Sequence, residues 1–145
     1  SLVLNVQVVR IEALTLRACS ALGAAASAPS PAARDKLLGL ASRDADRIAR
    51  TKRPWAEPLA EMVRGLAHAP KAPARAVAHL RVAADGFQRS EMAMHLAAAQ
   101  HRLGQLLGDD EGRMLLAAAR VRIAEQGIAR PDRIVDMLAP FPGVG

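Results

Sequence analysis

Proline and glycine residues divide this sequence into seven segments of helical length, and this punctuation constrains the fold more than any other feature. Proline is favoured at the first position of a helix and glycine just after its last. Helices are therefore predicted at about residues 2–26, 31–51, 54–68, 73–89, 91–107, 111–126 and 131–139. Because the connections are short, neighbouring helices should run antiparallel, which predicts an all-α fold of stacked helical hairpins.

Several boundaries carry a recognisable stop or start signal. Ser30 is placed to cap the second helix and Pro31 to open it, and Ser90 is the predicted N-cap of the fifth. Gly108 and Gly127 each follow a helical segment, where a left-handed residue commonly ends the helix. The predicted hairpins cover residues 2–51, 54–89 and 90–126, and a short terminal helix covers residues 131–139.

The first segment is the one place where a strand competes with a helix. Val6, Val8 and Ile11 could alternate as a strand, but residues 12–26 are strong helix formers, so a helix is predicted. Aromatic residues make up only 2% of the chain and tyrosine is absent. A core built from aliphatic and small side chains suits closely packed helices and argues against an all-β domain.

A spacing of small, large and small residues occurs twice, 36 residues apart. The two sets are Ala76, Leu80 and Ala83, and then Gly112, Leu116 and Ala119. This pattern resembles the second helix of a tetratricopeptide repeat, whose period is about 34 residues. The aromatic and glycine signature of the first helix of that repeat is mostly missing, with Trp55 and Gly65 as partial matches. The resemblance implies a short tetratricopeptide-like solenoid.

Residues 55–140 also resemble the C-terminal region of large bacterial signalling proteins, in which tetratricopeptide-like helices follow a protein kinase or regulatory ATPase domain. The resemblance rests on the segments FQRSEM at 87–92, LLGDDEG at 106–112, EQGI at 125–128, PDR at 131–133 and MLAP at 137–140. It implies that any kinase or ATPase chemistry lies upstream. We therefore expect residues 1–145 to be one helical-repeat domain excerpted from a larger chain.

The sequence offers no constellation of catalytic or metal-binding residues. The residues whose chemistry could serve a site are Cys19, the histidines His68, His79, His95 and His101, and the acidic run Asp109, Asp110 and Glu111. The histidines lack the spacing of zinc hydrolases, and carboxylates are favoured at a helix start in any case. Neither a phosphate-binding glycine loop nor a nucleophile elbow is present. We predict no enzyme activity, no cofactor and no metal.

Net charge raises nucleic-acid binding as the alternative function. The chain carries a formal charge of +6, and a basic stripe is predicted on the second helix at Arg43, Arg47, Arg50 and Arg53. Proteins that bind single strands also need aromatic stacking platforms. The chain has only Trp55, Phe87 and Phe141, and the first two fall on predicted core stripes.

The favoured function is a non-catalytic protein-interaction or intramolecular scaffold module of a bacterial signalling or regulatory protein. The first helices of tetratricopeptide hairpins line the inner face of the array, so a protein or peptide is predicted to bind there. The predicted contact residues are Glu61, Arg64 and His68 on the third helix and His95, Arg102 and Gln105 on the fifth. No segment has the apolar length of a membrane span and no signal peptide is apparent, so we expect a cytoplasmic, soluble domain.

Overall fold

The computed structural model describes residues 1–143, which contain seven helices and no strand. The helices are α1 (Leu2–Ala25), α2 (Pro31–Arg50), α3 (Glu57–His68), α4 (Pro73–Arg89), α5 (Ala93–Leu107), α6 (Asp110–Glu125) and α7 (Pro131–Leu138). The prediction of an all-α fold is therefore confirmed, and the early valines belong to a helix that begins at Leu2.

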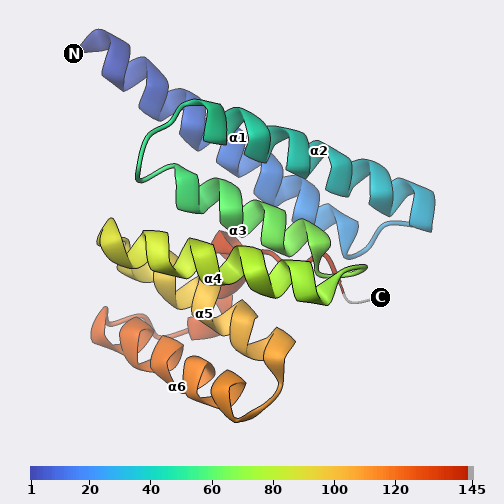
Figure 1. The fold of residues 1–145 in the computed structure, drawn as a ribbon, viewed down its shortest axis with the longest axis vertical. Coiled ribbons are helices and arrows are strands. Elements are labelled where there is room, and N and C mark those ends of the chain that lie inside the picture. The colour runs from blue at the N-terminus through green and yellow to red at the C-terminus, as the bar shows by residue number, and fades with distance from the viewer. Residues whose placement is uncertain (144–145) are drawn as a thin grey trace.

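Consecutive helices pair as antiparallel hairpins that stack on one another (Figure 1). The pairs are α1 with α2, α3 with α4, and α5 with α6, and the hairpins meet where α2 packs on α3 and α4 packs on α5. Helix α1 also contacts α3, so the first helices of the first two hairpins lie side by side. Helix α7 leaves this order and packs on α5 and α6.

Local chemistry starts or ends the helices at four of the predicted boundaries. The Ser30 hydroxyl accepts a hydrogen bond from the Ala33 amide at 3.1 Å, and Asp109 caps α6 by accepting from the Gly112 amide at 2.8 Å. Gly108 and Gly127 have φ angles of 66° and 72°, the left-handed conformation that glycine adopts without strain. The predicted roles of Ser30, Gly108 and Gly127 are confirmed, and Asp109 is one of the carboxylates expected at a helix start.

The start of α5 was predicted wrongly, because Ser90 ends α4 and does not cap α5. The Met92 amide donates to the Phe87 carbonyl at 2.9 Å and the Glu91 amide to the Gln88 carbonyl at 3.2 Å. These two bonds form a Schellman motif in which Glu91, with φ of 56°, takes the position usually given to glycine. Helix α5 consequently begins at Ala93 without a side-chain cap.

The start of α3 was also placed too early. The Ala56 and Glu57 amides both donate to the Arg53 carbonyl, which makes a turn of the segment that includes Trp55. The helix proper begins at Glu57, and Pro58 falls in its first turn, where a missing amide proton is tolerated.

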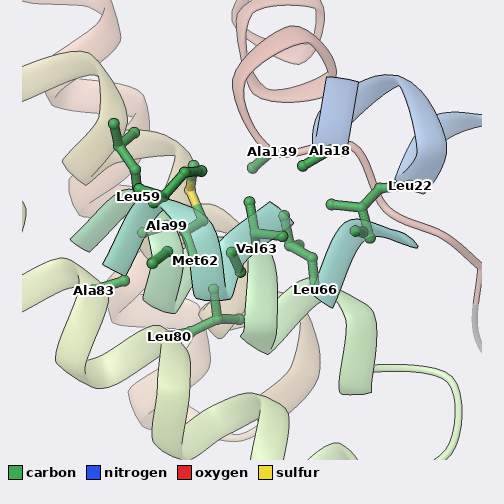
Figure 2. Close-up of a cluster of buried hydrophobic side chains, with 14 of the residues drawn as sticks. Ala18, Leu22, Leu59, Met62, Val63, Leu66, Leu80, Ala83, Ala99 and Ala139 are labelled. Carbon is green, nitrogen blue, oxygen red and sulfur yellow. The ribbon is translucent and has the colours of Figure 1, made fainter. Parts of the chain in front are cut away.

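Small residues bring the helices unusually close together. Ala76, Ala83 and Ala119 are fully buried, as the 36-residue pattern predicts. A Cβ atom added to Gly65 of α3 would lie 2.9 Å from Leu80 Cγ and 3.1 Å from the Ala76 carbonyl oxygen, both in α4. Figure 2 shows the cluster that results, in which the labelled side chains of α3 and α4 are Leu59, Met62, Val63, Leu66, Leu80 and Ala83.

The contact between α5 and α6 generates the first test. A Cβ on Gly104 would lie 2.6 Å from the Gly112 carbonyl oxygen, and this backbone atom cannot rotate away. We expect Gly104→Ala to force the hairpin apart and to lower the free energy of unfolding by about 1–3 kcal/mol, measured by urea denaturation.

Gly39→Ala is the matched control, because an added Cβ there meets only the flexible Arg43 side chain, at 3.4 Å. Replacing glycine by alanine within a helix should stabilise α2 by about 0.5–1 kcal/mol. If Gly104→Ala is as stable as the control, the close approach of α5 and α6 is wrong.

Candidate protein-binding surface

Three of the six predicted contact residues form a polar network at the boundary of α2, α3 and α4. Arg64 donates to Glu61 Oε1 and to Asp46 Oδ1, both at 2.8 Å. The second oxygen of Glu61 lies 2.7 Å from His79 Nδ1, and the rings of His68 and His79 stack with centroids 5.4 Å apart. Burial lowers the pKa of His68. These side chains therefore bind one another across three helices.

Arg102 does not lie on an open face, which corrects the expectation from the sequence. Its side chain is buried, with 5% of the residue exposed, and its Nε donates to the Ala139 carbonyl at 2.8 Å. The remaining guanidinium nitrogens donate to Gln105 Oε1 at 2.9 Å and to Asp136 Oδ1 at 2.8 Å. The guanidinium also lies over the Phe141 ring, 4.7 Å from its centroid. The sequence shows Arg102 on the polar side of its helix but does not show that α7 and the segment after it cover that side.

The segment after α7 continues from α5 back toward α1. Ala139 is fully buried in the same cluster as Ala18 of α1, and Figure 2 shows the two side by side. Pro140 lies beside Gly23 near the end of α1, and Pro142 is fully buried. Part of the inner face predicted to bind a partner is therefore filled by the chain's own residues.

The six predicted residues do not form one surface. Glu61, Arg64 and His68 contact α2 and α4, whereas Arg102 and Gln105 contact each other beneath α7. His95 lies apart from both groups, with its ring against Phe87 at a centroid distance of 5.3 Å.

His95 lines a pocket of about 340 Å³ that remains open on the inner face, between α1, the start of α3, α5 and α7. Its walls are Ile11, Glu12, Thr15, Leu16, Cys19, Trp55, Leu59, Met92, His95, Met137 and Leu138. The rim is strongly apolar, because Leu16 is 70% exposed and Met137 62% exposed. The sequence could not reveal this pocket, since its walls come from α1, the start of α3, α5 and α7, which are far apart along the chain.

The pocket walls are almost uncharged. The Thr15 hydroxyl donates to the Ile11 carbonyl at 2.7 Å and so presents little polarity to the pocket. Burial raises the pKa of the Cys19 thiol to about 11 and lowers the pKa of His95, which keeps both side chains neutral near pH 7. Glu12 is the one formally charged wall residue. The pocket is suited to apolar side chains.

Part of the basic stripe predicted for nucleic-acid binding already makes contacts within the chain. Arg53 donates through Nε to Gln7 of α1 at 3.0 Å, and Arg47 lies 3.8 Å from the buried carboxylate of Asp44. Arg43, Arg47 and Arg50 remain exposed on α2. Phe87 is fully buried and therefore cannot stack on a base.

Comparisons with protein-family models, with curated proteins and with solved structures found no match. Within residues 1–143, no three or more histidine, cysteine or acidic residues gather as a metal site would require. None of the helices described there has the combined length and hydrophobicity to cross a bilayer.

The buried position of Arg102 leads to a second test. Arg102→Ala removes the bond to the Ala139 carbonyl and the contact with Phe141. We expect a loss of about 2 kcal/mol in the free energy of unfolding and faster hydrogen exchange after residue 135. Arg113→Ala, which removes an exposed pair with Asp110, is the control and should change stability little. Equal stability of the two variants would show that Arg102 does not anchor the C-terminal segment.

The thiol of Cys19 provides a third test. A pKa of about 11 instead of 9.0 lowers the thiolate fraction near pH 8 by about 100-fold. We expect reaction with a disulfide reagent to be slower than that of a cysteine peptide by at least that factor, and its rate to rise with pH up to about 11. A rate that levels off near pH 9 would mean that the pocket wall at Cys19 is open to water.

Proposed function

We propose that this chain is a non-catalytic protein-binding module that receives apolar side chains of a partner in the pocket between α1, α3, α5 and α7. The observation that carries the proposal is the open, nearly uncharged pocket with Leu16 and Met137 exposed at its rim. Leaving such side chains in water is unfavourable by about 25 cal/mol for each Å² of apolar surface. An apolar patch of this kind beside a pocket is typical of an interaction site.

The fold adds support to this proposal. The inner face made by α1, α3 and α5 already accommodates residues 139–142, part of a chain segment without regular structure. Arg102 binds this segment through a main-chain carbonyl, Ala139 O, which is independent of side-chain identity. The same face is thus able to pack against polypeptide, and the pocket is its unfilled part.

The resemblance of residues 55–140 to bacterial signalling proteins suggests the class of partner. We propose a cytoplasmic scaffold role in which a kinase or ATPase domain of the same signalling system, in the same chain or another, contacts the pocket. The small-large-small pattern of α4 and α6 supports a tetratricopeptide-like array in which the first helix of each hairpin faces the partner. Nucleic acid is the weaker alternative, because Phe87 is buried and Arg53 binds Gln7.

The test uses the single tryptophan, Trp55, which lines the pocket. Purified kinase and ATPase domains of the system are titrated against the chain while Trp55 emission is followed. Met137→Glu places a charge at the rim without removing a buried side chain, and we expect it to weaken binding by about tenfold or more. Met114→Glu, at a 74% exposed position on α6, is the control and should bind as the wild type does.

Equal affinity of the Met137→Glu and Met114→Glu variants would place the partner elsewhere. Binding that instead falls steeply with salt and is lost on replacing Arg43 and Arg50 would favour the basic face of α2.

A further inference from the structure

Helix α1 carries two apolar stripes on opposite sides, and only one of them is buried. The buried stripe packs against the rest of the fold and comprises Ile11, Leu14, Ala18, Leu22 and Ala25. The other stripe faces solvent and comprises Leu2, Val6, Val9, Ala13 and Leu16. In this second stripe Leu2 is 80% exposed, Val6 59% and Val9 63%. An amphipathic surface helix needs only the first stripe, so the second requires its own explanation.

The spacing of the exposed stripe is that of a coiled-coil seam. Its members are separated by four, three, four and three residues, which gives the mean period of 3.5 that keeps a seam facing a partner helix. In heptad terms Leu2, Val9 and Leu16 occupy the d position, and Val6 and Ala13 the a position. Val6 at a, with Leu2 and Leu16 at d, matches the pattern that favours two parallel strands, whereas Val9 at d and Ala13 at a depart from it.

The charges that flank the seam select the same arrangement. Glu12 falls at the g position, and Arg10 and Arg17 fall at e. In a parallel in-register pair, Glu12 of one copy faces Arg17 of the other, which is five residues further along. In an antiparallel pair the e positions face each other, which places arginine against arginine. The bonds of Arg17 to Asp44 use Nε and Nη2, which leaves Nη1 to reach a second carboxylate.

The position of α1 allows such a pairing. Figure 1 shows its N-terminal end extending beyond the other helices, at the top of the stack. The exposed stripe points away from the buried one. The α1 helix of a second copy could therefore pack on the exposed stripe without contacting the core of the first copy. Residues 2–16 span about 21 Å at 1.5 Å per residue. Two heptads make a short seam, so the pair should be weak and its population should depend on concentration.

We infer that two copies of this chain associate through the exposed stripe of α1 as a parallel, two-fold symmetric coiled-coil pair. Each copy offers the same surface to the other, as a two-fold interface requires. This interface shares Leu16 and Glu12 with the proposed partner pocket, because both residues also line the pocket.

The experiment measures molecular mass by sedimentation equilibrium from micromolar to near-millimolar concentration. We expect the wild-type chain to shift toward twice the monomer mass as concentration rises. Val9→Glu should raise the dissociation constant by at least about tenfold, because it places a charge at the centre of the seam. Val121→Glu makes the same substitution at an exposed position of α6 and should leave the dimer unchanged. Circular dichroism confirms that both variants remain folded.

Orientation is tested by disulfide formation in a Cys19→Ala chain. Ala13→Cys should link two copies rapidly under mild oxidation, since like a positions meet only in the parallel register. A dimer whose Ala13→Cys variant does not crosslink would overturn the parallel arrangement. A wild-type chain that stays monomeric throughout, or a dimer indifferent to Val9→Glu, would overturn the proposal.

Sedimentation with neutral lipid vesicles tests whether a bilayer surface, instead of a second copy, covers the exposed stripe of α1. Vesicle binding by a monomeric wild-type chain that is lost in Val9→Glu would assign the stripe to a bilayer surface and overturn pairing with a second copy. Failure of the dimer would leave the proposed pocket untouched, because the pocket test uses Met137 on α7.

Discussion

Close approach of helix backbones is the constraint on which this structure depends. With aromatic residues at 2% of the chain, few large side chains are available to fill wide gaps between helices. Gly65 allows α3 to approach Leu80, and Gly104 and Gly112 allow α5 and α6 to meet almost backbone to backbone. Dispersion contacts accumulate only at such short distances, so alanine and glycine here define which helix faces can meet.

The closely packed helices leave two apolar surfaces uncovered and open to contact with other molecules. The chain uses α7 and the residues after it to cover the inner face over α5, where Arg102 binds Ala139 and Asp136. It does not cover the pocket beside Cys19 or the outer stripe of α1. Both uncovered regions are apolar and lie on or beside α1, which therefore links the core to the surfaces proposed for a partner and for a second copy.

Local signals predicted much of the fold, because they act within a few residues. Ser30, Asp109, Gly108 and Gly127 cap or stop helices by bonds to their own neighbours, and the sequence shows these neighbours directly. The prediction that Ser90 caps α5 is wrong because Glu91 takes the left-handed conformation that is normally found at glycine, which ends α4 at that point. The predicted contact residues do not form one surface because helical periodicity reveals which residues share a face but not what covers that face. Arg102 is the clearest case, since the segment that buries it lies more than thirty residues away in sequence.

The most direct test of the claim that the inner face between α1 and α7 is a protein-binding site is to map chemical-shift changes in this chain when a partner binds. Amide and methyl signals of the chain are recorded with and without a kinase or ATPase domain that binds it. The account predicts that the largest changes occur at Leu59, Met92 and Met137, with little change at Glu61 and His79. Changes centred on Arg43, Arg47 and Arg50, with the pocket signals unmoved, would contradict it.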